Sequence, residues 1–264
     1  MTRSARSMLV GLVVLLLAGS LASAAYAEAG PFFHQRLKGE KGSGVKIAEK
    51  SPENFSGSGG EQILKTSIVG EPIEIVTKGQ QVKGVIYNTA LQGQAKVLMV
   101  FKEPRLVKPA LSKCEVKIGE SNQTKFRVYL TWKWDGTKEQ LVNKNPGSVQ
   151  AFDGTVIDSE IAAGAKEFPK GLFTTVKLTN CGVLGGSFAV RGSATAPKFV
   201  PSKLEEWSRE LNLTYGEGKL KQHFWNGGEF IGGETGLFFG ESSADLTGTG
   251  SLGAEKQEVA VFER

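Results

Sequence analysis

The feature that most constrains the fold of this chain is a strict alternation of residue types between Lys125 and Trp134. The side chains that fall on one face are apolar: Phe126, Val128, Leu130, Trp132 and Trp134. The other face would carry Lys125, Arg127, Tyr129, Thr131 and Lys133. Because successive side chains of a β-strand point to opposite sides, this pattern predicts a strand with one buried face and one wet face.

Short apolar alternations of the same kind recur from Gln62 to the end of the chain, separated by Gly, Asn and Pro. Such a series predicts an all-β fold, a mostly antiparallel sandwich or barrel, with residues 62–264 as a single β domain. The stretch 93–101 is apolar at both parities, which is typical of a central strand covered on both sides.

One segment has a helical period. Ser202 and Glu205 match a capping box, and Leu204, Trp207 and Leu211 repeat on one helical face. These residues predict one short α-helix at about 202–212. A helix of this length needs tertiary support, so we expect Trp207 to dock on a sheet.

The first 27 residues have the layout of a signal peptide. Arg3 and Arg6 precede an apolar run over 8–17, and Ala25-Tyr26-Ala27 is a small-x-small cleavage pattern. This predicts an N-terminal signal helix, a secreted or extracytoplasmic protein, and no membrane span after cleavage. The alternative is a protein tethered by an uncleaved N-terminal segment.

Two segments are rich in glycine, of which the chain has 34 residues. Residues 28–61 combine Gly, Ser and Lys, which is typical of an arm or a long loop. Residues 248–253 match the G-x-G-x-x-G pattern of dinucleotide-binding proteins, but no helix pattern or distant acidic residue follows. We therefore expect a loop at 248–253 and no nucleotide cofactor.

The two cysteines, Cys114 and Cys181, are predicted to form a disulfide because an exported chain meets an oxidising environment. A free thiol is the alternative. The only histidines are His34 and His223, so a three-histidine metal site is excluded, as is a zinc site made of cysteines alone. The sequence predicts no metal and no cofactor.

The charge balance is mildly basic, with 32 Lys+Arg against 27 Asp+Glu. The densest basic patch consists of Lys102, Arg105, Lys108, Lys113 and Lys117. It would suit an anionic surface polymer, with a solvated loop as the alternative. Export argues against nucleic acid as a partner.

A candidate ligand-binding site lies around the Asn226-Gly227 turn signal. A three-residue turn over 226–228 would set Phe224 opposite Phe230 and place four residues on one wet face: Lys221, His223, Trp225 and Glu229. A tight Asn-Gly turn would shift this register. An exposed Trp beside His and Glu suits a saccharide or a peptide. In the alternative interpretation, the Gly/Ser-rich arm covers Trp225.

No motif of a nucleophile elbow, a zinc protease, a Walker loop or a calcium loop is present. The sequence therefore favours a non-catalytic protein of the cell surface or extracytoplasmic space, with a binding or structural role and a polysaccharide or cell-envelope polymer as partner. The alternative is a secreted carbohydrate-active hydrolase using a carboxylate pair on a sheet face. Its catalytic residues remain unassigned among Asp153, Asp158, Glu160, Glu229 and Glu234.

Three runs of the sequence resemble those of a group of uncharacterised secreted bacterial proteins. They are His-Phe-Trp-Asn-Gly at 223–227, Leu-Glu-Glu-Trp-Ser at 204–208 and Val-Ala-Val-Phe-Glu at 259–263. The similarity extends along most of the mature chain. This resemblance implies export and a common fold, and it carries no activity, cofactor or catalytic residue.

Overall fold

The structure of the protein is a computed structural model. It describes residues 32–90, 92–133, 153–157, 171–196, 198–200, 205–215, 221–225, 230–234 and 236–262. The predicted signal peptide, residues 1–27, lies outside these ranges. Within them, no helix is both long enough and apolar enough to cross a membrane.

Strands account for nearly all of the regular structure, so the predicted all-β, antiparallel class is confirmed. In chain order they are β1 (Phe32–Arg36), β2 (Val45–Lys46), β3 (Glu53–Ile68), β4 (Glu71–Thr77), β5 (Gly79–Asn88), β6 (Gly93–Lys102), β7 (Arg105–Lys108), β8 (Glu115–Ile118), β9 (Gln123–Lys133), β10 (Asp153–Ile157), β11 (Leu172–Thr179), β12 (Gly186–Ala196), β13 (Lys198–Val200), β14 (Glu210–Tyr215), β15 (Lys221–Trp225), β16 (Phe230–Glu234), β17 (Gly236–Phe239), β18 (Ser242–Ala254) and β19 (Glu258–Phe262). A 3₁₀ turn, η2 (Gly182–Leu184), separates β11 from β12.

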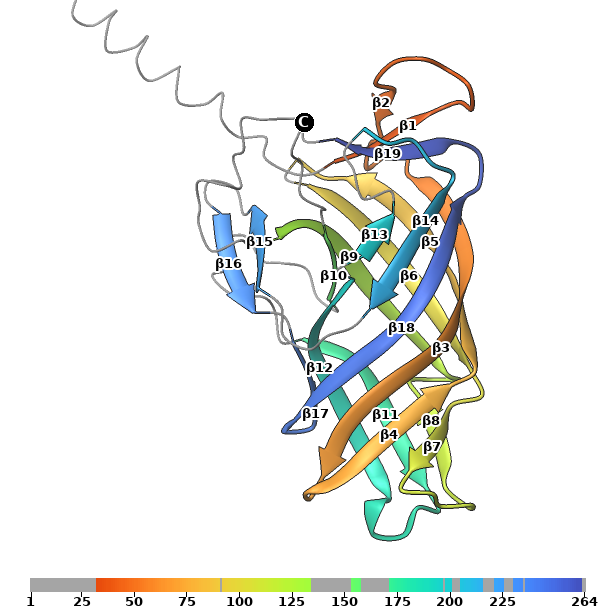
Figure 1. Cartoon of the computed structure of the whole chain (residues 1–264), viewed down its shortest axis with the longest axis vertical. Coiled ribbons are helices and arrows are strands. Elements are labelled where there is room, and N and C mark those ends of the chain that lie inside the picture. Colours follow the sequence, from red (N-terminus) through yellow and green to blue (C-terminus); the bar gives the residue numbers. More distant parts are fainter. Residues whose placement is uncertain are drawn as a thin grey trace, which may run out of the picture.

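Most of these strands form one barrel-like sheet (Figure 1). Antiparallel pairing runs from β3 through β5, β6, β9, β10, β12, β17 and β18, and β18 pairs again with β3. Strands β4, β7, β8 and β11 extend the sheet toward the lower end in Figure 1. Of the two architectures that the sequence allowed, a sandwich or a barrel, the sheet has the barrel-like form.

A small sheet of β19, β1 and β2 lies at the opposite end (Figure 1). The side chain of Asn88, at the end of β5, holds it in place: Phe33 N donates to Asn88 Oδ1 at 2.7 Å, and Asn88 Nδ2 donates to Phe33 O at 2.6 Å. Val259, Ala260 and Val261 of β19 are fully buried. The small sheet and the barrel-like sheet therefore share one core.

The alternation over β9 holds for most of the described side chains. Phe126 and Leu130 are buried and Lys125 is exposed, as predicted. Tyr129 was expected on the wet face, but it is only 2% exposed. The outer side of the sheet is therefore covered at this row, which residue parity could not indicate.

The prediction of an α-helix at 202–212 is wrong for residues 205–212. Backbone amides of this segment bond to β19, with Glu205 N donating to Val261 O and Ser208 N donating to Val259 O. Strand β14 begins at Glu210 and pairs with β18. A short amphipathic segment is marginal as a helix, so pairing with strand edges decides its conformation. Trp207 nevertheless docks on the small sheet, with its ring 5.6 Å from that of Phe262.

Both glycine-rich segments are strands, so the expected loop at 248–253 and the expected arm from Glu53 to 61 are wrong. Residues 55–65 of β3 pair with residues 245–254 of β18. A Cβ at Gly57 would lie less than 3.0 Å from Ser251 O. The absent side chains let the backbones of two strands approach each other closely, a role that composition alone does not distinguish from loop flexibility. Strands β1 and β2 also lie within the expected arm.

The turn between β3 and β4 carries a residue that does not suit it. Val69 and Gly70 have φ values of 50° and 82°, and Val69 is 97% exposed. Positive φ at both central positions favours Asn-Gly and disfavours a β-branched residue. We expect Val69→Asn to raise the free energy of unfolding by about 1 kcal/mol, measured in urea. Val183→Asn is the control, since Val183 is 99% exposed and its φ is not positive. An equal gain in both variants would contradict the turn argument.

Candidate functional site

A surface groove of about 660 Å³ lies over β3, β5, β6 and β9. Four of its lining residues carry positive charge, and two aliphatic side chains lie among them. We call this site the cationic groove and define it by Lys83, Lys96, Lys125, Arg127, Val85 and Leu98. The three lysines are exposed and Arg127 is half-buried.

Strand register brings the four cations together. Lys83 of β5 pairs with Leu98 of β6, which pairs with Lys125 of β9. In the next row that faces outward, Val85 pairs with Lys96, which pairs with Arg127. Neighbouring strands lie about 4.8 Å apart, so the cations occupy a patch two strand spacings wide.

A buried row between these two outward rows fixes their positions. It runs across the four strands through Phe55, Gly84, Val97 and Phe126. Its three large side chains are 2–6% exposed. A Cβ at Gly84 would lie less than 3.0 Å from Lys96 O, so the glycine permits the close approach of β5 and β6. The four cations therefore belong to well-packed strands rather than to loops.

Carboxylates are scarce in the described lining of the groove. Among the described residues that line it, Glu255 is the only carboxylate. Lys96 and Arg127 are direct cross-strand partners, and like charges in this position cost about 0.2–1 kcal/mol relative to neutral pairs. The Lys96 ammonium group also lies 5.4 Å from the centre of the Tyr87 ring. An anion bound in the groove would relieve the repulsion.

The hairpin of the predicted ligand site, β15 and β16, has neither the register of the three-residue turn nor that of the tight Asn-Gly turn. Trp225 pairs with Phe230, and Phe224 pairs with Ile231, so the expected pairing of Phe224 with Phe230 is wrong. His223 lies opposite Trp132 of β9 and opposite Gly232 of β16.

Lys221 lies opposite Glu234, whereas Glu229 lies outside the described residues, as do the side chains of Lys221, His223 and Trp225. Their role as a binding site therefore stays a prediction.

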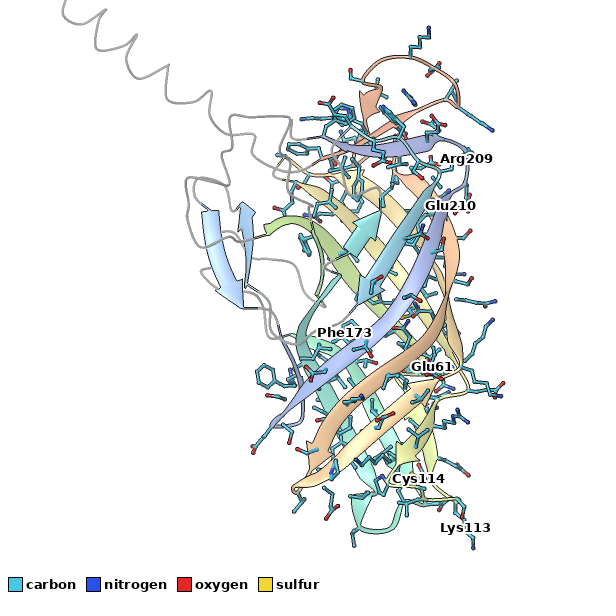
Figure 2. All side chains as sticks on the ribbon, viewed as in Figure 1. Glu61, Lys113, Cys114, Phe173, Arg209 and Glu210 are labelled. Atoms are coloured by element: carbon cyan, nitrogen blue, oxygen red, sulfur yellow. A yellow bond between two sulfur atoms is a disulfide. The ribbon has the colours of Figure 1, made fainter. Side chains whose placement is uncertain are left out.

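The disulfide between Cys114 and Cys181 is confirmed, and neither cysteine is free. It joins the segment before β8 to the start of η2, at the lower end of the molecule where Cys114 is labelled in Figure 2. A disulfide fits a protein that works in an oxidising, extracellular environment.

The basic patch predicted over 102–117 lies at this same end, where Lys113 is labelled in Figure 2. Acidic groups are interleaved with it. Lys78 forms an ion pair with Glu103, and Lys108 lies opposite Glu74. Like charges also face each other here, because Lys117 lies opposite Lys177 of β11. The sequence missed the groove because its four cations come from three strands, although the wet face that carries Lys125 and Arg127 was a partial signal.

The described residues contain no group of three or more His, Cys, Asp or Glu side chains placed to hold a metal ion. The groove has one carboxylate rather than the pair that glycoside hydrolysis uses. Of the carboxylates considered for a hydrolase, Asp158, Glu160 and Glu229 lie outside the described residues, as do the side chains of Asp153 and Glu234. The hydrolase alternative stays untested.

Comparison of the chain with protein-family models, with curated proteins and with solved structures finds no match in any of the three. The resemblance to secreted bacterial proteins therefore remains an expectation from the sequence.

Proposed function

We propose that this protein is an exported, non-catalytic binding protein whose cationic groove takes an anionic polymer of the cell surface or extracytoplasmic space. The observation that carries the proposal is the set of four cations on adjacent strands with one carboxylate beside them. A cluster of one sign raises the local concentration of counter-ions and steers charged ligands toward it.

The form of the groove favours a polymer over a small enclosed anion. Its cations are spread over β5, β6 and β9 in two rows, and the lysines are exposed. A chain with repeated charges would engage several of them at once. Val85 and Leu98 lie between the cations and offer contact to the apolar faces of a sugar or a polymer backbone.

The expected cellular setting supports the same proposal. The signal-like N-terminus predicts export, and the disulfide between Cys114 and Cys181 fits an oxidising environment. Outside the cytoplasm, the abundant polyanions are envelope and matrix polymers with phosphate, sulfate or carboxylate groups.

Charge reversal tests the proposal directly. We expect Lys83→Glu with Lys125→Glu to weaken binding by about 30-fold or more, since each exposed cation near a polyanion contributes about 1 kcal/mol. The probes are linear inorganic polyphosphate and alginate, with dextran as the neutral polymer, and binding is measured by calorimetry. Raising the salt concentration from 50 to 500 mM should weaken the wild-type interaction, because exposed charges are screened (about 14 Å against about 4 Å Debye length).

A matched variant separates the groove from net charge. Lys113→Glu with Lys117→Glu makes the same change in charge on exposed residues of the basic patch. We expect this control to bind nearly as well as the wild type. Equal weakening in both variants would show non-specific attraction, and binding of dextran, or of neither polyanion, by the wild type would overturn the proposal.

A further inference from the structure

A row of uncharged residues lies directly beside the cationic groove, on the same outward face of β5, β6 and β9 (Figure 1). Gln81 of β5 pairs with Val100 of β6, which pairs with Gln123 of β9. The two glutamines are exposed and Val100 is half-buried. We call these three residues the amide row. Its side-chain amides are open to a ligand that extends beyond the groove.

The amide row repeats the pattern of the adjacent row of the groove, which we call the lysine row. In the lysine row, Lys83 and Lys125 flank Leu98 in the way that the two glutamines flank Val100. Matching positions of the two rows are two residues apart on each strand, a distance of about 6.8 Å. One buried residue separates them on each strand, with 3–6% exposure: Val82, Met99 and Thr124. Packed strands therefore hold the two rows at a fixed separation.

The two rows suit different groups of a ligand. A lysine ammonium group only donates hydrogen bonds and carries positive charge, so the lysine row suits acid groups. A glutamine amide both donates and accepts, as a hydroxyl group does, so the amide row suits neutral hydroxyls. Leu98 and Val100, both half-buried, lie between the flanking residues and offer apolar contact. A ligand that matches both rows has acid groups along one edge, hydroxyl groups along the other and an apolar face between them.

We propose that the polymer bound by the cationic groove is an acidic polysaccharide, which lies across β5, β6 and β9 with acid groups over the lysine row and ring hydroxyls over the amide row. This inference rests on the proposed function and narrows the class of its ligand. A uronate residue has the required arrangement, since its carboxylate and its ring hydroxyls lie at opposite edges of one ring with C–H groups between them. Inorganic polyphosphate has neither hydroxyls of this kind nor an apolar face, so it engages mainly the cations.

Removal of the two amides tests this inference. Gln81→Met with Gln123→Met keeps the length and the neutrality of the side chains and removes their hydrogen-bonding groups. We expect the affinity for alginate, a polymer of uronates, to fall by about 10-fold, because the hydrogen bonds of two neutral groups are lost. The affinity for polyphosphate should fall much less. Calorimetry measures both, and equal changes for the two polymers, or no loss for alginate, would overturn the inference.

A matched variant controls for the added apolar surface. Thr179→Met with Ser187→Met places two methionines at exposed positions of β11 and β12, outside the groove and the amide row. We expect this control to bind alginate as the wild type does. A loss as large as that of the amide variant would show an unspecific effect of methionine and would overturn the inference.

A second measurement uses the unaltered protein, so that a variant that fails to fold leaves the test intact. The NMR signals of the Gln81 and Gln123 side-chain amides should shift on saturation with alginate oligosaccharides, and should shift less with polyphosphate. Unmoved amide signals would overturn the inference. Binding of polyphosphate without binding of alginate would overturn this inference alone, whereas binding of neither polymer would overturn the proposed function together with it.

Discussion

Gly57→Ala is expected to cost about 3 kcal/mol or more of the free energy of unfolding, enough to leave little soluble protein. The added Cβ would lie less than 3.0 Å from Ser251 O and from Leu252 Cα, both in the backbone of β18. Neither atom can move alone, because β18 pairs with β3 along its length. Overpacking against a rigid partner typically costs 1–3 kcal/mol and occasionally more.

Gly60→Ala is the matched control in the same strand. The nearest atom to its added Cβ would be the Thr249 hydroxyl oxygen at 3.6 Å, an ordinary contact distance. We expect this variant to be neutral or more stable by up to about 1 kcal/mol, because alanine reduces the freedom of the unfolded chain. Urea denaturation of both variants measures the difference. Similar stability in the two variants would show that the β3–β18 approach is looser than described.

Removal of the disulfide has the second large effect. We expect Cys114→Ala with Cys181→Ala to lower the free energy of unfolding by about 4 kcal/mol, since the bond closes a loop of 67 residues. The bond constrains the unfolded chain more than it adds contacts to the folded one. Cys181 is 3% exposed, so alanine is preferred to serine, which would bury a new hydroxyl.

The reduced wild-type protein provides the control for the disulfide. Its free energy of unfolding, measured in urea with a reductant, should match that of the double variant to within about 1 kcal/mol. The pairing of β8 with β11 brings the two cysteines together. If both samples lose less than about 1 kcal/mol of the free energy of unfolding, the unfolded chain stays compact around these two strands. A loss in the variant alone would point to a packing defect at the alanines.

The alternation of residue types along one strand predicts which side chains face outward, but not which residues of neighbouring strands lie beside them. The alternation over β9 places Lys125 and Arg127 on its outward face, and the structure confirms Lys125 as exposed. The alternation of residue types within β9 does not reveal that Lys96 pairs with Arg127, or that Lys83 lies in the same row as Lys125. The same limit applies to the hairpin of β15 and β16, where a change of one residue in the register altered every expected pair.

Local sequence determined the strand character of most segments, because a period of two depends only on near neighbours. The disulfide was predictable for another reason, since the chain has only two cysteines and a signal-like N-terminus. Tertiary structure decided the rest. The glycines at 57 and 248–253 are strand residues because β3 and β18 pair closely there. Residues 205–212 pair with strands because β18 and β19 present edges that this segment can join. The cationic groove likewise exists only through long-range register, which depends on contacts between distant segments that a single strand's sequence does not encode.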